Sequence, residues 1–417
     1  MFKPTLVALS LASMACAFGA HAQQQQQQTL KIALIDPLSG PMADVGKIFE
    51  NHLRFAADNI NAAGGIDGIK LEVLAFDNKL STQESQAALQ AAVGAGVKAV
   101  FVGGGSATAT AVITAANRNN ERNPDKSVLV FNFGGIDPDL VGKSCSFWHF
   151  MTDAQVTMRM KAYADFVKKT PDIKKVYFLN PDYSFGRQWT AFGKNLLGQA
   201  RSDIQFVGED FFPTGTVKDF APYIAKMRAA GADTVVSGNW GNDMALMIKA
   251  AGESGYKLRI LTHSSANKST MIALDAAPTV KLNMIGEWFP GADNPTAAKL
   301  ESAFESKYKE AFYLVRLSTA TELLAQGVRK ARSTDPKQIA SALEGISYKS
   351  ILGDVTVRKE DHQFMAPQYV YTNHKVDGKT VKKGFDGTNQ GFVAESLAPV
   401  SALAVPNQCE MKRPAGV

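Results

Sequence analysis

The sequence predicts an α/β protein built of doubly wound parallel sheets. Short apolar segments, typical of strands buried on both faces, alternate along the chain with segments of helical periodicity. This alternation indicates parallel strands with helices on both faces of a sheet. It restarts after residues 146–150, and 417 residues suit two lobes better than one core.

The composition is that of a folded globular protein. Hydrophobic residues make up 45% and charged residues 20% of the chain, which excludes disordered and collagen-like classes. The formal net charge of +6 comes from scattered rather than clustered side chains. Charge therefore predicts no nucleic-acid partner.

The first 22 residues have the features of a signal peptide. Lys3 precedes an apolar stretch at 6–19, which is too short to span a bilayer as a mature helix. The Ala-His-Ala pattern at 20–22 fits a cleavage site after Ala22. An alternative is a lipoprotein cleaved before Cys16, but the residues before that cysteine make a poor lipid-attachment motif. We expect an exported protein.

A glutamine-rich leader at 23–28 follows the predicted cleavage site. Cleavage leaves two cysteines, Cys145 and Cys409, which are a candidate disulfide in an oxidising compartment. The alternative is a pair of free buried thiols. If formed, the bridge would tie the C-terminal tail to the middle of the chain.

The first half of the folded chain predicts four strands with helices between them. Ser81, with Glu84 three residues later, forms a capping box that begins the second helix. The strands are expected at 31–36, 71–77, 97–102 and 128–133, and the other helices at 48–60 and 107–117.

The second half repeats this pattern. No Pro/Ser-rich linker separates the halves, so we expect short strands to connect the lobes as a hinge. The strands are expected at 176–180, 204–209, 234–237 and 258–262, and the helices at 154–168, 186–199, 217–229, 242–253, 297–309, 318–331 and 336–344.

Candidate ligand contacts follow several strands. The glycines at 103–105 precede Ser106 and open a helix, but they lack the G-x-G-x-x-G and G-K-[ST] patterns of nucleotide sites. Ser106 suits a helix N-cap and a ligand contact, and both roles are compatible. Gly134 and Gly135 permit close backbone approach to a ligand or form an ordinary turn.

Aromatic residues also lie at predicted strand ends. Tyr183, Phe185 and Trp240 suit packing against a ligand, and the alternative for such residues is the core of a lobe. His263 ends another strand and is a candidate for lining a cleft. The six histidines are isolated, and G-x-S-x-G, H-E-x-x-H and C-x-x-C motifs are absent from the sequence. We expect no enzyme, no metal and no cofactor.

Two segments resemble the opening of the periplasmic branched-chain amino-acid (Leu/Ile/Val-type) binding proteins. They are D-P-L-S-G-P at 36–41 with Gly46, and I-N-A-A-G-G-I-D-G at 60–68. Residues 182–186 and 304–353 resemble the same family, so the similarity covers nearly the whole mature chain.

The resemblance implies a type I periplasmic-binding fold, with two doubly wound lobes joined by a three-strand hinge. Lobe 1 would comprise 29–148 and 286–360, and lobe 2 would comprise 149–285 and 361–417. A monomer of this family captures a small organic ligand between its lobes, closes by a hinge motion and delivers the ligand to an ABC permease. The alternatives are a soluble sensing module for a separate receptor and a secreted α/β enzyme.

The resemblance also implies a ligand site. In the family, loops matching 105–108 and 134–136 bind the ligand carboxylate, and lobe 2 adds aromatic rings. Where amino-acid binders often place an acid for the ammonium, this chain has His263 and Ser264, and a buried ammonium without an acid is costly. The expected ligand is an amino acid or a small aromatic or other carboxylate or amide, and the missing acid favours the carboxylates and amides over a free amino acid. The expected ligand contacts are Ser106, Ala107, Thr108, Gly134, Gly135, Ile136, Tyr183, Phe185, Asn239, Trp240, His263 and Ser264.

Overall fold

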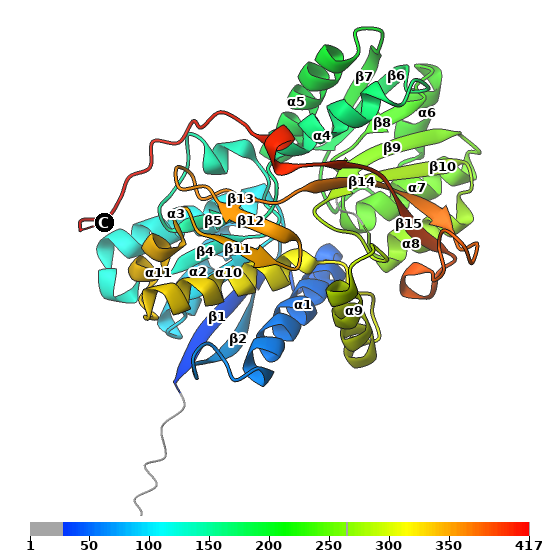
Figure 1. Cartoon of the computed structure of the whole chain (residues 1–417). Coiled ribbons are helices and arrows are strands. Elements are labelled where there is room, and N and C mark those ends of the chain that lie inside the picture. Colours follow the sequence, from blue (N-terminus) through cyan, green and yellow to red (C-terminus); the bar gives the residue numbers. More distant parts are fainter. Residues whose placement is uncertain (1–27, 264–265, 417) are drawn as a thin grey trace, which may run out of the picture.

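The protein has two α/β lobes that lie side by side (Figure 1). The computed structural model describes residues 28–263 and 266–416. The predicted signal peptide, most of the leader and Ser264 lie outside the described residues. Within those residues, no helix is both long and apolar enough to cross a bilayer.

Lobe 1 is built on a five-stranded parallel sheet in the order β2-β1-β3-β4-β5. Successive residues of β1 point to opposite faces, so Ile32 and Leu34 join one core and Ala33 and Ile35 join the other. The strands are β1 Thr29–Asp36, β2 Lys70–Asp77, β3 Ala99–Val102, β4 Leu129–Asn132 and β5 His149–Met151.

Helices cover both faces of this sheet. One core contains side chains of α1, α10 and α11, and the opposite core contains side chains of α2 and α3. A smaller aromatic core joins α1 to α9. The helices are α1 Ala43–Ala62, α2 Thr82–Gly94, α3 Ser106–Arg122, α9 Pro295–Tyr308, α10 Val315–Ala331 and α11 Pro336–Leu343.

Lobe 2 is built on a seven-stranded sheet in the order β15-β14-β10-β9-β8-β6-β7. Its apolar residues also form two cores, one against α4 and α5 and one against α6, α7 and α8. The strands are β6 Lys175–Pro181, β7 Gln205–Phe212, β8 Thr234–Val236, β9 Leu258–His263, β10 Val280–Gly286, β14 Gln368–Lys375 and β15 Gln390–Ala398. The helices are α4 Val156–Lys168, α5 Ser184–Ala200, α6 Ala221–Ala229, α7 Gly241–Glu253 and α8 Lys268–Ala276.

The predicted strands and helices are present, with further elements that the sequence pattern did not indicate. The N-cap half of the predicted capping box is confirmed, because Ser81 Oγ accepts a hydrogen bond from the Glu84 amide at 3.3 Å. The reciprocal half is not formed, since the Ser81 amide donates to the Asn78 oxygen and Glu84 pairs with Lys79. The expectation of purely parallel sheets is wrong at one edge, where β14 runs antiparallel to β10 and pairs with β15 as a hairpin. The elements that were not predicted are β5, β10, α8, β14, β15 and the small antiparallel sheet of β11 Ser347–Ser350, β12 Gly353–Val357 and β13 Phe364–Met365.

Three segments connect the two sheets: β5 to α4, the end of β10 to α9, and β13 to β14. The first and the third are linked by a hydrogen bond, since Gln363 Nε2 donates to the backbone oxygen of Asp153 at 2.8 Å. The lobe boundaries expected from the resemblance stay a prediction.

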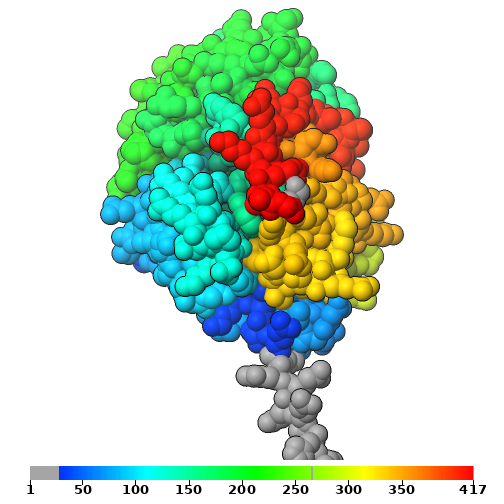
Figure 2. All heavy atoms as spheres, turned by 90° about the vertical axis from the view of Figure 1, so that its left-hand side faces the viewer, coloured from blue at the N-terminus to red at the C-terminus, as the bar shows by residue number. Residues whose placement is uncertain are grey.

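The C-terminal tail is a further link between the lobes. Leu403, in the 3-10 turn Val400–Leu403, is buried in the α4–α5 core of lobe 2. Beyond it, a disulfide joins Cys409 to Cys145, with the two Cα atoms 5.7 Å apart. Arg413 then pairs with Glu344 of lobe 1. Figure 2 shows this red segment lying over the junction of the two lobes.

Candidate ligand-binding cleft

A cavity of about 70 Å³ lies between the two sheets, at the carboxyl ends of their central parallel strands. Ligands of open α/β folds bind at this end of the strands. The volume limits the ligand to a small molecule. The lining consists of Val45, Phe49, Gly103, Gly105, Phe133, Gly134, Tyr183, Phe185, Trp240, Gly241, His263, Ala266, Asn267, Tyr313, Leu314 and Arg316.

Glycine loops after β3 and β4 form much of the lobe 1 wall. Gly105 has a φ of +115°, which an L side chain rarely adopts, and it precedes α3 directly. The two loops touch, because a Cβ on Gly134 would lie 2.4 Å from the Gly103 oxygen. The side chain of Asp36, at the end of β1, accepts hydrogen bonds from the Gly103 and Gly104 amides. These loops therefore need glycine in order to pack as they do.

Aromatic side chains form the lobe 2 wall. Tyr183 and Trp240 come from different strand ends, and Trp240 Nε1 donates a hydrogen bond to Tyr183 Oη at 3.2 Å. Phe185 packs edge-on against His263, with ring centroids 5.1 Å apart. These rings give the cavity flat apolar surfaces and a phenol hydroxyl.

Four helices begin at the cavity. Gly105, Tyr183, Trp240 and Asn267 are the N-cap residues of α3, α5, α7 and α8, and all four line the cavity. Each helix N-terminus carries a partial positive charge of roughly half a unit. The convergence of four such ends favours an anionic group on the ligand.

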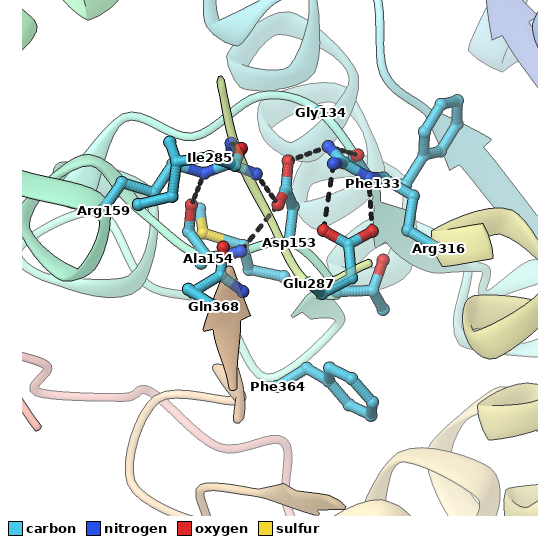
Figure 3. Close-up of polar contacts among 12 residues, drawn as sticks. Phe133, Gly134, Asp153, Ala154, Arg159, Ile285, Glu287, Arg316, Phe364 and Gln368 are labelled. Carbon is cyan, nitrogen blue, oxygen red and sulfur yellow. Dashed lines mark hydrogen bonds and ion pairs between the residues drawn. The ribbon is translucent and has the colours of Figure 1, made fainter. Parts of the chain in front are cut away.

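Arg316 of α10 supplies a full positive charge in the wall. Its side chain is 7% exposed and is ion-paired with Asp153 and Glu287 (Figure 3). Burial opposes the charge, but the two carboxylates hold the pKa of Arg316 above its ordinary value. His263 is neutral by contrast, because burial lowers its pKa to about 3. Among the described lining residues there is no Asp or Glu.

The structure brings together five of the residues expected in the site. Gly134, Tyr183, Phe185, Trp240 and His263 all line the cavity. Four of the five belong to the lobe 2 wall, where aromatic residues at strand ends gave a visible signal. Phe185 also packs in the α4–α5 core, so the core interpretation of this residue is confirmed, while its contact with a ligand stays a prediction.

The other expected contacts lie outside the described lining. Ser106 is buried and its Oγ accepts a hydrogen bond from the Asp137 amide at 3.2 Å, so it ties together the loops after β3 and β4. It does not cap α3, whose N-cap is Gly105. Ser264 is not among the described residues. The remaining residues outside the lining are Ala107, Thr108, Gly135, Ile136 and Asn239.

Sequence reasoning missed much of the lobe 1 wall. Phe49 and Phe133 resemble core residues in sequence, and their rings pack edge to face with centroids 5.0 Å apart. Tyr313 and Arg316 belong to the loop before α10 and to its first turn, which no strand-end pattern marks. In the sequence Arg316 is only a charged residue at the second position of α10, and its burial there is not visible.

Comparison with known proteins agrees with this geometry. Residues 29–378 match the family model described as periplasmic binding protein. The chain is 31% identical over 437 residues to Leu/Ile/Val-binding protein homolog 4 of Brucella abortus, covering 99% of both chains. The chain belongs to the periplasmic binding protein family. Within that family it is a substrate-binding protein of the ABC-transporter type, which captures a small organic ligand between its two lobes.

Solved structures give the same fold. A leucine-, isoleucine-, valine-, threonine- and alanine-binding protein from Brucella ovis, in a closed conformation, has a TM-score of 0.81 and 27% identity, covering 93% of this chain and 100% of that one. A solute-binding protein of R. palustris in complex with benzoate has a TM-score of 0.75 and 17% identity, covering 92% and 99%.

The lobes of this periplasmic binding protein touch across the cleft. A Cβ on Gly241 of lobe 2 would lie 3.0 Å from Met42 Sδ of lobe 1, and a Cβ on Gly105 of lobe 1 would lie 3.6 Å from Tyr183 Oη of lobe 2. Such contacts from both sides of the cavity indicate a closed arrangement.

A second pocket of about 250 Å³ adjoins the cavity. It shares Val45, Asn267 and Tyr313 with the cavity lining. Unlike the inner cavity, its described lining contains carboxylates. These are Asp44, Glu310 and Asp386. Across residues 28–263 and 266–416, no group of three or more His, Cys, Asp or Glu side chains is arranged to hold a metal ion.

Proposed function

We propose that this protein captures a small carboxylate with an aromatic or branched apolar body and delivers it to an ABC permease. The observation that carries the proposal is the convergence of four helix N-termini and the Arg316 guanidinium on a cavity without a carboxylate in its described lining. The aromatic walls match an apolar body, because ligand sites combine apolar surface with a few placed polar groups.

The same charge pattern disfavours a free amino acid. A buried ammonium needs a carboxylate partner, and the cost of leaving it unpaired is several kcal/mol. Between His263 and Ala266 the sequence has only Ser264 and Ser265, which carry no charge. The Brucella and Pseudomonas relatives are named for amino acids, whereas similar R. palustris structures contain benzoate and hydroxybenzoates.

The adjoining pocket favours an amino acid as the second candidate, because three carboxylates, Asp44, Glu310 and Asp386, line it beside two lysines, Lys47 and Lys268. Asp386 and Glu310 both lie close enough to Tyr313 to influence its titration, and Tyr313 lines both pockets. An ammonium placed there would have acidic neighbours while the carboxylate stays in the inner cavity.

A thermal-shift panel separates the two candidates. It consists of benzoate, 4-hydroxybenzoate, phenylacetate and 4-methylpentanoate, each beside its primary amide, together with leucine and phenylalanine. A ligand that binds only the folded state raises Tm by mass action. We expect shifts with the carboxylates and affinities of about micromolar or tighter, roughly 8 kcal/mol. Shifts with the amino acids alone would overturn the proposal in favour of the second candidate.

We extend the proposal to processing and assembly. The chain is exported, cleaved after Ala22 and works as a monomer without enzymatic activity, with the lobes divided near residues 148, 285 and 360. For protein purified from the periplasm, we expect an intact mass that corresponds to a chain beginning at Gln23. Light scattering should give the mass of a monomer. A lipid-modified Cys16 would contradict it.

A further inference from the structure

Arg316 lines the cavity and also belongs to a buried network of ion pairs. Its Nε and Nη2 donate to the two oxygens of Glu287, both at 3.0 Å. Its Nη1 donates to Asp153, whose other oxygen accepts from Arg159. Figure 3 shows Asp153 between the two guanidinium groups. The four side chains sum to zero charge.

The partners of Arg316 come from the connections between lobes. Asp153 lies between β5 and α4, and Glu287 directly follows β10. Arg159 of α4 is fixed in turn, since its Nε donates to the Ala154 oxygen at 3.0 Å and its Nη1 to the Ile285 oxygen at 2.8 Å. The guanidinium of Arg316 is thus held in one orientation from two connecting segments.

The network leaves donor capacity on Arg316. A guanidinium has five N–H groups. Two go to Glu287 and one to Asp153, and a fourth reaches the Phe133 oxygen at 3.5 Å. The remaining N–H of Nη2 has no acceptor within residues 28–263 and 266–416. Arg316 lines the cavity, so this N–H is the donor that we assign to a ligand oxygen.

Other polar groups in the wall are poorer anchors for an anion. His263 is uncharged and its Nε2 lies 3.2 Å from the Gly238 oxygen. The side-chain oxygen of Asn267 accepts from the Thr270 amide and from Ser269 Oγ. Tyr183 offers a neutral hydroxyl. Arg316 is the one fully charged group among the described lining residues.

We propose that Arg316 is the specificity-determining residue of this site, binding the ligand carboxylate directly and selecting carboxylates over neutral analogues of the same shape. This inference rests on the proposed function. The ligand charge adds to a neutral network, and the four helix N-termini around the cavity compensate it. A charge-assisted hydrogen bond in a closed, water-poor site discriminates strongly between a carboxylate and an amide.

The experiment compares acid and amide pairs. Binding of benzoate against benzamide, and of 4-methylpentanoate against 4-methylpentanamide, is measured by calorimetry for wild type, Arg316→Gln and the double variant Glu287→Gln with Arg316→Gln. We expect wild type to prefer the acids by at least about 30-fold. Both variants should reduce this preference to about threefold or less, mainly by weaker acid binding.

The double variant distinguishes the loss of a direct contact between Arg316 and the ligand from electrostatic repulsion by the unpaired carboxylates. Arg316→Gln alone leaves Asp153 and Glu287 with less positive charge beside the cavity, which repels an anion without any lost contact. The double variant restores the local charge balance and retains hydrogen-bonding groups, and it carries the test if the single variant does not fold. A recovered acid preference in the double variant would overturn the proposal.

Arg159→Gln is the matched control, since Arg159 binds the other oxygen of Asp153 but is not in the described lining. We expect it to lower Tm and, by removing a charge from the network without removing a cavity group, to reduce the acid preference far less than Arg316→Gln does. If Arg316→Gln still binds acids tightly and with an unchanged acid preference, the role of Arg316 is overturned while the proposed ligand class stands. Wild type binding leucine but no acid of the panel would overturn the proposed ligand class and this inference together.

Discussion

The two walls of the cleft both carry aromatic rings but differ in how much backbone they expose. Lobe 1 brings the chain close to the ligand space at Gly103, Gly105 and Gly134, beside the rings of Phe49, Phe133 and Tyr313, whereas lobe 2 presents mainly the rings of Tyr183, Phe185 and Trp240. Closure sets one against the other, since a Cβ on Gly105 would lie 3.9 Å from Trp240 Cζ2. The difference teaches that both lobes supply apolar surface, while the close backbone approach that shapes the site comes mainly from lobe 1.

The loops behind the walls also differ in how they are held. In lobe 1, the buried carboxyl of Asp36 accepts hydrogen bonds from Gly103 and Gly104, and burial holds its pKa well above the ordinary range. In lobe 2, Asn180 Oδ1 accepts from the Gly238 amide at 2.5 Å and its Nδ2 donates to Thr190 Oγ1 at 2.8 Å. The same positional role is performed by an acid in one lobe and an amide in the other.

The largest effect on ligand affinity should come from adding one methyl group to the glycine loops of the lobe 1 wall. Gly134→Ala places a Cβ 2.4 Å from the Gly103 oxygen, so the two glycine loops must move apart. Overpacking of this kind costs about 3 kcal/mol, or about 100-fold in Kd if it falls on the bound state. Calorimetry with the best acid of the panel measures it.

Gly94→Ala is the control for this change. Gly94 ends α2 at an exposed position, and a Cβ there would meet nothing within 4 Å. Alanine is favoured over glycine in a helix, so Tm should stay level or rise slightly while Kd is unchanged. Equal Kd values for Gly134→Ala and wild type would show that the lobe 1 wall is not shaped by close backbone approach.

Removing a ring from lobe 2 should have the next largest effect. Trp240→Ala deletes apolar surface and the hydrogen bond to Tyr183 Oη, and truncation of such an anchor costs about 2 kcal/mol, or about 30-fold in Kd. The far-ultraviolet circular dichroism spectrum should be unchanged. Leu397→Ala, which truncates an exposed apolar side chain on β15, is the surface control. Wild-type affinity in Trp240→Ala would remove this residue from the site.

The smallest expected effect concerns pH. Burial lowers the pKa of His263 to about 3, so its ring is neutral from pH 5.5 to 7.5 and gains no charge as pH falls through its ordinary pKa of about 6.5. Acid ligands stay ionised in this range. Affinity should therefore vary by less than about twofold. A Kd that tightens severalfold toward pH 5.5 in wild type, but not in His263→Gln, would show that His263 shares the anchoring of the anion.

Sequence patterns predicted the sheets better than the site. The segments 32–35 and 176–179 are continuously apolar because both faces of the strands are covered, and that pattern is visible in the sequence. The strand β15 mixes apolar and polar residues at a sheet edge, and it was missed. Within the site, the rings at strand ends were predictable from position. Arg316 was not, since its ion-pair partners Asp153 and Glu287 lie 163 and 29 residues away and only the fold unites them.

The disulfide between Cys145 and Cys409 has a consequence for the integrity of the chain. The two cysteines are 264 residues apart, and every strand of the lobe 2 sheet lies between them. That stretch forms a covalent ring, so one cut by a protease anywhere from residue 146 to residue 408 yields two pieces that remain one molecule. The nicked protein should migrate at full size on a gel without reductant and separate into fragments only once thiols are added. Outside the cytoplasm, where proteases act and disulfides persist, a single break leaves both walls of the cleft on the same covalent body.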